Sequence, residues 1–183
     1  KTRTASEVIA DHLKEPGVRQ VVWLANTREL VEQAIQCMSE VWDHVGTRRC
    51  RFNRAWDGNL KRIPDWSEEE CVFTVMSLQS GWKLVDGDYD GFRELFSHTT
   101  LVVVDEAHIA VAPTYSEVIR SFVRTSQCKV LGLTATPGRT IEDETYELAD
   151  LFFGNICSLE DPDKSRDNAI GYLRSIGVMA EAF

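Results

Sequence analysis

The sequence predicts an α/β fold with a mostly parallel sheet and helices on both faces. Short apolar runs of strand length alternate along the chain with segments whose apolar residues repeat at helical spacing. One run, residues 101–104, is apolar at every position, which is typical of a strand buried on both faces. With 183 residues and 43% hydrophobic content, the chain is long enough to bury one sizeable core.

The first half of the chain supplies two helices and two strands. Each helix has apolar residues three or four positions apart, and each strand is a short apolar or β-branched run. A Pro16-Gly17 pair ends the first helix, because proline cannot continue a helix. Two glycines and a proline then break the pattern before the second strand. The expected elements are a helix over residues 2–14, a strand over 21–24, a helix over 30–42, an irregular excursion over 46–70 and a strand over 71–76.

The second half continues this alternation of amphipathic helices and apolar strands. Its expected elements are a helix over residues 89–96, a strand over 101–104, a helix over 115–123, a strand over 129–136 and helices over 142–153 and 168–176. In a parallel sheet covered by helices, ligands bind at the carboxyl ends of the strands. The residues that carry function are therefore expected at those ends.

Composition excludes several kinds of site. The formal net charge of -9 argues against a domain that grips nucleic acid by charge alone, so any such contact must be local. The five cysteines form no CxxC pair, and no histidine lies at zinc-ligand spacing, so neither a zinc site nor a redox motif is indicated. No apolar run approaches the roughly 18 residues of a membrane span. We therefore expect a cytoplasmic protein with no membrane partner.

Two acidic residues follow the fully apolar strand at its carboxyl end. They are Asp105 and Glu106, in the run Asp-Glu-Ala-His. Phosphoryl transfer needs a carboxylate for the magnesium shell and a group that positions the attacking water. Asp105 suits the first role, and Glu106 suits the second as general base. The alternative is that the two acids only cap the following helix.

A second strand ends in two hydroxyl groups, within the run Leu-Gly-Leu-Thr-Ala-Thr-Pro-Gly-Arg of residues 131–139. If it neighbours the strand before Asp105, Thr134 and Thr136 lie beside the carboxylates and sense changes at a γ-phosphate. Taken alone, the same run is an ordinary strand exit.

Asp-Glu-Ala-His followed by Leu-Thr-Ala-Thr-Pro resembles motifs II and III of superfamily 2 helicases. The pair is more similar to the DNA-directed branch, with restriction-enzyme motor subunits and excision-repair helicases, than to DEAH-box RNA helicases. The resemblance implies the first RecA-like P-loop NTPase lobe of a motor that uses ATP and Mg²⁺ to move on nucleic acid, DNA more than RNA. It also implies a second RecA-like lobe of the same parent chain as partner, and a coupling role for His108 with Thr134 and Thr136.

The resemblance extends to two segments that meet the nucleic-acid backbone in this family. Residues 23–30 resemble motif Ia, in which the helix amides, Thr27 and Arg28 suit a phosphate. A plain capping box, with Asn26 as the cap, is the alternative. Residues 73–78 resemble motif Ib, which would place the Thr74 hydroxyl on the backbone at a strand end.

The first two residues, Lys1 and Thr2, match the closing Lys-Thr of a Walker A loop, in which lysine reaches the phosphates and the hydroxyl meets magnesium. An arbitrary chain start is the alternative. On this basis we expect a lobe truncated before the glycine loop. Residues 1–160 would form a partial ATP-binding lobe, and residues 161–183 would lead toward the second lobe. The parent would hydrolyse ATP, whereas residues 1–183 alone would be inactive.

Some assignments stay open at this point. An arginine cluster interleaved with aromatic residues suits single-stranded nucleic acid or, equally, a solvated loop balanced by acids at residues 68–70. Its members are Arg48, Arg49, Arg51, Arg54, Phe52 and Trp56. A translocase that does not separate strands is one rival function. A degenerate lobe that only binds nucleic acid or protein is another, although the intact Asp105-Glu106 pair weighs against it.

Overall fold

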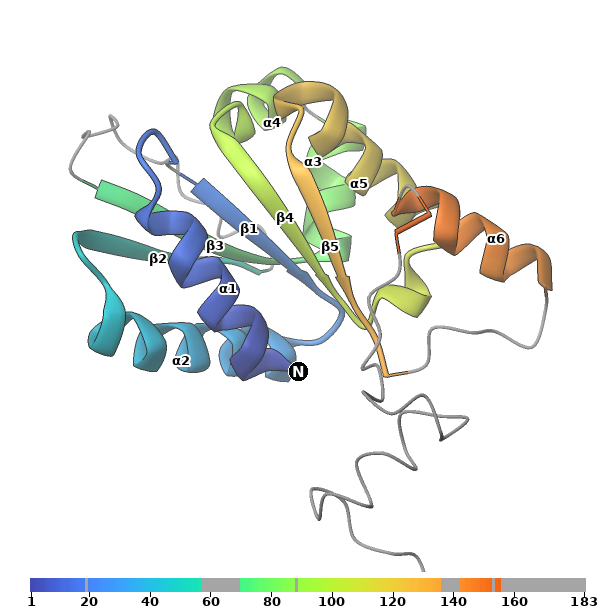
Figure 1. The fold of residues 1–183 in the computed structure, drawn as a ribbon. Helices are drawn as coiled ribbons and strands as arrows, with labels where there is room; N and C mark the ends of the chain where they lie inside the picture. The colour runs from blue at the N-terminus through green and yellow to red at the C-terminus, as the bar shows by residue number, and fades with distance from the viewer. Residues whose placement is uncertain (19, 57–69, 88, 136–141, 153, 156–183) are drawn as a thin grey trace, which may run out of the picture.

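The computed structural model describes residues 1–18, 20–56, 70–87, 89–135, 142–152 and 154–155. Within this part of the chain, five parallel strands form one sheet in the order β2-β3-β1-β4-β5 (Figure 1). The strands are β1 (Gln20–Ala25), β2 (Arg49–Ala55), β3 (Glu70–Ser77), β4 (Thr99–Asp105) and β5 (Lys129–Leu133). This sheet confirms the predicted α/β class.

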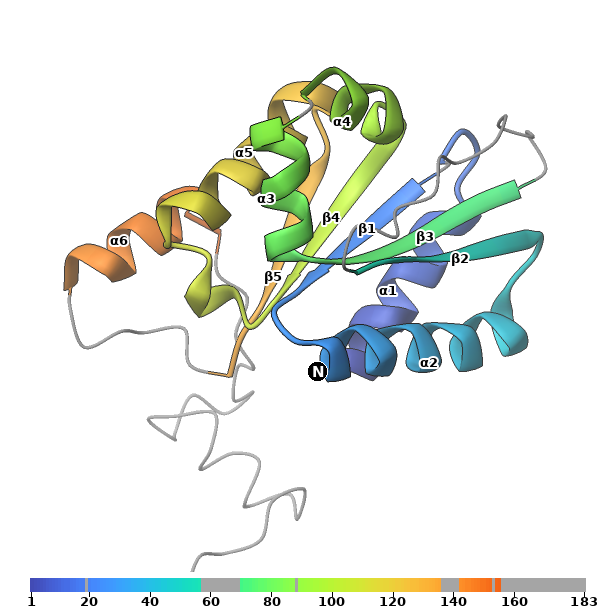
Figure 2. The same ribbon diagram turned by 180° about the vertical axis from the view of Figure 1, so that it is seen from behind.

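Helices cover both faces of the sheet, as Figures 1 and 2 show from opposite sides. One face carries α1 (Thr2–Lys14) and α2 (Arg28–Val45), and the other carries α3 (Leu78–Gly87), α4 (Tyr89–Phe96), α5 (Pro113–Ser126) and α6 (Glu142–Leu151). The central strand β1 is buried at every position, because its alternate side chains meet a helix layer on each face.

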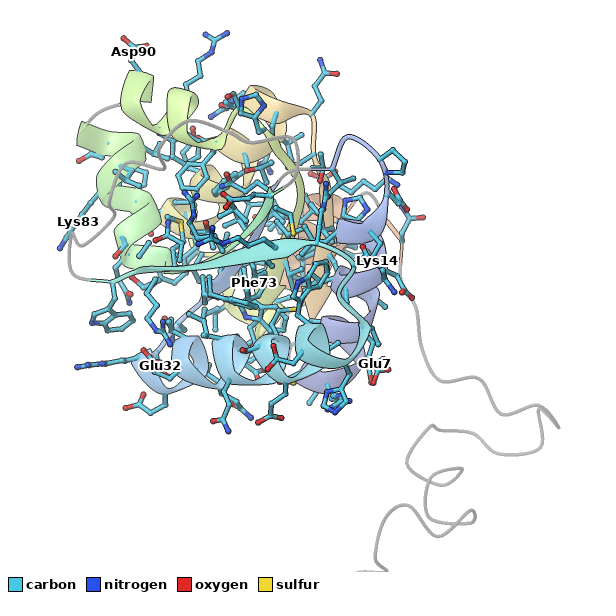
Figure 3. The ribbon with its side chains drawn as sticks, turned by 90° about the vertical axis from the view of Figure 1, so that its left-hand side faces the viewer. Glu7, Lys14, Glu32, Phe73, Lys83 and Asp90 are labelled. Carbon is cyan, nitrogen blue, oxygen red and sulfur yellow. The ribbon has the colours of Figure 1, made fainter. Side chains whose placement is uncertain are left out.

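Two apolar cores result, one on each side of the sheet. On the α1–α2 side, Phe73 lies at the centre of β3 and packs edge-on against Trp23 of β1, with ring centroids 6.4 Å apart (Figure 3). On the other side, Phe92, Phe96 and Phe122 form a cluster with centroids 4.8 to 5.1 Å apart. Burial of these large aromatic rings accounts for much of the apolar area that holds the helices to the sheet.

Several predicted boundaries differ from the structure. The excursion expected over residues 46–70 is wrong in part, because Arg49–Ala55 forms the edge strand β2. The helix α3 was not predicted, and β5 ends at Leu133 instead of residue 136. The helix expected over residues 168–176 and the linking segment 161–183 lie outside the described residues. Among the described helices, none combines the length and apolar character that crossing a bilayer requires.

Candidate active site

The predicted acids lie at the carboxyl edge of the sheet, where β4 and β5 end close to the start of α1 (Figure 1). Asp105 is the last residue of β4 and is only 2% exposed. The four apolar residues before it bury β4 between β1 and β5, so the carboxylate is fixed by a buried strand. Glu106 follows immediately and is partly exposed.

The backbone turns sharply at Glu106. This residue adopts the left-handed conformation, with φ 50° and ψ 52°, which costs a non-glycine residue about 1–2 kcal/mol. The backbone N–H of Glu106 donates to Oδ1 of Asp105 at 3.0 Å, which stabilises the turn. A short 3₁₀ helix, η1 (Ala107–Ile109), begins directly after it. Such strained residues cluster at functional sites, and here the turn aims Glu106 toward the start of α1.

Lys1 brings a positive charge to both acids. Its Nζ donates to Oε1 of Glu106 and lies 3.6 Å from Oδ1 of Asp105. Lys1 is the N-cap residue of α1, and Thr2 is the first residue of that helix. The amides of a helix N-terminus and a lysine ammonium both favour a phosphate at such a position. The structure therefore brings Lys1 together with Asp105 and Glu106, and Thr2 follows Lys1 at the start of α1.

His108 connects the acids to the end of β5. Its Nδ1 lies 3.4 Å from Oε2 of Glu106 and 3.3 Å from Oγ1 of Thr134. Because β4 and β5 pair in parallel up to Asp105 and Leu133, Thr134 reaches the same edge as the acids. Thr134 therefore lies beside His108, which in turn contacts Glu106. Thr136 lies outside the described residues.

One packing contact beside η1 was not predicted from the sequence. A Cβ on Gly132 of β5 would lie 2.6 Å from the ring of Phe152 and 3.0 Å from Cβ of Ala107. The missing side chain therefore lets Phe152 pack against β5 beside η1. A glycine inside an apolar strand is the signal that marks such a close approach.

The start of α2 forms a second part of the edge. Thr27 is its N-cap, and the Thr27 Oγ1 accepts from the backbone N–H of Leu30 at 3.3 Å. The capping box with Asn26 as cap is therefore wrong by one residue. The pKa of Glu29 is lowered by its own backbone N–H and then by the Thr27 hydroxyl. Arg28 is exposed, and within the described chain no ion pair holds its guanidinium.

The placement of Thr74 at a strand end is wrong. Thr74 lies inside β3, three residues before Ser77, and its side chain is fully buried, so its hydroxyl does not reach the surface. The strand end carries Ser77, whose Oγ accepts from the backbone N–H of Ser80 at 3.0 Å and caps α3. Exposed Gln79 follows, with its Nε2 donating to the Tyr115 hydroxyl at 3.2 Å.

These residues lie beside the start of α2. Ala25 of β1 and Ser77 of β3 are partners in the sheet, so the N-termini of α2 and α3 face the same edge side by side. The polar run after an apolar strand, Ser-Leu-Gln-Ser, is the signal that would have marked this strand end.

The arginine cluster is already engaged within the protein. Arg48 binds two backbone carbonyls, Arg49 and Arg51 pair with Glu70 at 3.2 and 2.5 Å, and Arg54 pairs with Glu32 at 3.1 Å (Figure 3 labels Glu32). The cluster is a strand rather than a loop, and it is balanced by Glu70. A single-stranded nucleic-acid site built on these arginines is not supported.

Comparison with known proteins gives matches across most of the chain. The sequence profile of the family described as "Type III restriction enzyme, res subunit" matches residues 1–139. The DEAD-box ATP-dependent DNA helicase Fancm of Drosophila melanogaster is 29% identical over 162 residues, which are 85% of this chain and 10% of that protein. The ATP-dependent DNA helicase mph1 of Aspergillus niger is 32% identical over 145 residues, which are 78% of this chain and 12% of that protein. The chain thus spans about a tenth of the length of these curated relatives.

A solved structure matches the fold. The crystal structure of the Pyrococcus furiosus Hef helicase domain superposes with a TM-score of 0.59 at 24% identity, over 84% of this chain and 31% of that one. At this identity the likeness concerns the fold, which is the RecA-like lobe that the sequence predicted.

Proposed function

Because the chain belongs to the family of type III restriction enzyme res subunits, we propose that its carboxyl edge is the ATP-hydrolysis site of a DNA helicase or translocase motor. One observation carries this proposal. Lys1, Asp105 and Glu106 converge from α1 and β4, and His108 links them to Thr134. This arrangement provides a cation for phosphate, a carboxylate for a metal and a base for water.

The roles follow from the environment of each side chain. Lys1 contacts both acids and can exchange them for phosphate oxygens, because its ammonium is mobile on a four-carbon stem. Glu106 then becomes free to accept a proton from water, as a general base does. His108 touches Glu106 and Thr134 at once, so a movement of Glu106 is transmitted to β5.

The donor groups fit magnesium together with a phosphate chain. Asp105 offers a buried carboxylate and Thr2 a hydroxyl, and Mg²⁺ prefers such oxygen ligands while keeping water and phosphate ligands. In the described ranges, no three His, Cys, Asp or Glu side chains gather into a cation cage. When bound, the ion neutralises charge on the phosphates.

The second part of the proposal concerns DNA. Arg28 with the N-termini of α2 and α3 offers a local phosphate site on an otherwise acidic chain. The names of the relatives, which are DNA helicases, support DNA over RNA. A second RecA-like lobe as partner, the division at residue 160 and a cytoplasmic location remain proposals.

The test of the hydrolysis site is Glu106→Gln in the full-length protein. The amide keeps the shape but cannot accept a proton, so ATP turnover at saturating DNA should fall by about 10²- to 10⁴-fold. Binding of a fluorescent ATP analogue should persist. Glu7→Gln on the surface of α1 makes the same chemical change away from the acids and should leave turnover unaltered (Figure 3 labels Glu7).

Wild-type turnover in Glu106→Gln would refute the base assignment, whereas a wild-type protein without ATP turnover would favour the binding-module alternative. If turnover is lost as expected, strand-displacement and triplex-displacement assays on the wild type separate an unwinding helicase from a translocase that leaves the strands paired.

A further inference from the structure

Two free cysteines lie directly opposite each other in neighbouring strands. Cys50 is the second residue of β2 and Cys71 the second residue of β3, and the two are register partners in the parallel ladder. Cys50 is half-buried at the edge of the sheet, whereas Cys71 is buried. They lie at the amino ends of their strands, opposite the edge that carries Asp105.

The spacing of the strands suits a covalent bond between these residues. Neighbouring strands lie about 4.7–4.9 Å apart, and a disulfide needs a Cα separation of roughly 4.4–6.8 Å. Register partners in a parallel pair point to the same face, which here is the α1–α2 side. The Cys71 thiol donates to the carbonyl oxygen of Arg49 at 3.7 Å, so its sulfur lies beside the start of β2, next to Cys50.

The two thiols differ in acidity. The neighbouring Cys50 thiol lowers the pKa of Cys71, and the Arg48 guanidinium lowers it further against the opposing effect of burial. The neighbouring Cys71 raises the pKa of Cys50, and burial adds to that rise. A thiolate therefore forms more readily on Cys71 than on Cys50. A thiolate, not a thiol, is the species that attacks sulfur or peroxide.

We propose that Cys50 and Cys71 form an oxidation site, at which hydrogen peroxide converts the two thiols into a disulfide that joins β2 to β3. The Cys71 thiolate bonds to one peroxide oxygen as the O–O bond breaks, which gives a sulfenic acid on Cys71. The departing hydroxide leaves as water after taking a proton from solvent. The Cys50 thiol then loses its proton to solvent, and its sulfur attacks the sulfur of Cys71. The S–O bond breaks, and the sulfenic oxygen departs as a second water.

The balance is two thiols and one peroxide giving one disulfide and two waters, so both sulfurs are oxidised and the peroxide is reduced. The product fixes an edge strand to the sheet by a covalent bond. The spacing along the sequence does not reveal the pair, because the parallel crossover alone brings Cys50 and Cys71 together. The proposal is independent of ATP hydrolysis.

The test is a peptide map of the reduced protein before and after a stoichiometric dose of hydrogen peroxide. Remaining thiols are blocked with N-ethylmaleimide under denaturing conditions. The protein is then digested, and the masses of the peptides are measured by mass spectrometry. We expect a linked peptide that joins Cys50 to Cys71, two hydrogens lighter than the reduced pair, which dithiothreitol reverses. In Cys50→Ser, dimedone should trap a sulfenic acid on Cys71. Cys37→Ser and Cys128→Ser, which change thiols outside the pair, should still form the link.

The wild-type map decides the question even if a variant fails to fold. A sulfinic acid on Cys71 without a link, or unmodified Cys50 and Cys71 at a dose that oxidises other cysteines, would overturn the proposal. A mixture of links that includes Cys37 or Cys128 as often as Cys50 with Cys71 would show scrambling of an unfolded chain and would also overturn it.

Discussion

Arg48 shows how one side chain holds separate segments of the chain together. Its Nη2 donates to the carbonyl oxygens of Leu13, at the end of α1, and of Val18, at 2.6 and 2.5 Å. Its own carbonyl oxygen accepts from Nε1 of Trp42 at 3.0 Å. The carbonyl of Leu13 belongs to the last turn of a helix, where no intrahelical donor remains, so a cation is favoured there.

Arg48→Met should therefore lower the free energy of unfolding by about 3 kcal/mol or more, since its two charge-assisted hydrogen bonds contribute about 1.5–3 kcal/mol each when partly buried. The midpoint of urea denaturation measures the change. Arg49→Met is the matched control, because the Arg49 side chain is 79% exposed and its pairing with Glu70 should contribute less than about 1 kcal/mol. Equal losses in both variants would show that the carbonyl contacts of Arg48 are unimportant.

His12 makes stability depend on pH. Burial lowers its pKa below the ordinary 6.5, Lys129 lowers it further, and Glu15 at 3.5 Å opposes both. The unfolded chain therefore binds a proton at higher pH than the folded chain. Above pH 6.5 both states are neutral at this residue, and stability is lost as pH falls through 6.5 toward the folded pKa.

His12→Gln should flatten this dependence. Glutamine retains a donor for Oγ1 of Thr100, which lies 3.0 Å from Nε2 of His12, but it does not titrate. Urea midpoints measured from about pH 7.5 to about pH 5.5 should fall more steeply for the wild type than for the variant. His44→Gln on the exposed side of α2 is the control. If the urea midpoint falls equally with pH in the wild type, His12→Gln and His44→Gln, the assignment to His12 is contradicted.

At single positions, the sequence predicted functional residues correctly where polar side chains directly follow an apolar strand. Asp105, Glu106, His108 and Thr134 were predicted together because two neighbouring strands deliver them to one edge. The Thr74 placement failed because the apolar run of β3 continues to Met76, so the strand ends later than the motif suggested. Gly132 and its contact with Phe152 depend on a distant segment that no local pattern specifies.

At the scale of elements, β2 and α3 were missed for different reasons. In β2, arginines alternate with Cys50 and Phe52, which pack toward the core. This alternation was not recognised as a strand because the segment contains so many charged residues. Charge on an edge strand also discourages pairing with another chain. The helix α3 contains Gly81 and Gly87, which have poor helix propensity, and it forms because Ser77 caps it and α5 packs against it.

Gly81 allows α3 to approach α5. A Cβ at this position would lie 2.9 Å from Cγ1 of Val118, a buried and branched side chain that cannot swing away. Gly81→Ala should therefore destabilise the protein by about 1–3 kcal/mol through overpacking, although alanine favours a helix.

Gly87→Ala in the same helix is the control, because a Cβ there meets nothing within 4 Å. It should be neutral or stabilising by up to about 1 kcal/mol. Thermal or urea unfolding compares the two variants, and stabilisation by both would mean that α3 and α5 adjust without strain.

For the whole molecule, periodicity predicted the layers but not the order of the strands. Alternating patterns show that strands and helices cover one another, whereas the order β2-β3-β1-β4-β5 depends on which distant strands pair. The resemblance to superfamily 2 helicases is confirmed by the family match over residues 1–139. The resemblance therefore supplied the family of the chain, which local hydrophobic patterns do not contain.

The charge of the whole chain limits how it can hold DNA. With a net charge of -9, the chain as a whole repels phosphates, so binding must depend on a few cations placed at the carboxyl edge. Arg28 is exposed at the start of α2, where the helix amides also favour an anion. Arg93 is also exposed, but it lies on α4 at the opposite end of the sheet (Figure 1).

Arg28→Ala and Arg93→Ala in the full-length protein change the net charge equally. Comparing them therefore separates a local contact of Arg28 with DNA from the effect of the total charge. Arg28→Ala should weaken binding of DNA by a similar factor for unrelated sequences, because phosphate contacts carry no sequence information. The slope of log affinity against log salt should become shallower by about one, the value for one phosphate contact. Arg93→Ala should leave that slope unchanged. Fluorescence anisotropy titrations at several salt concentrations measure both slopes. Equal slopes in the two variants would show that Arg28 acts only through the total charge and that the backbone path lies elsewhere.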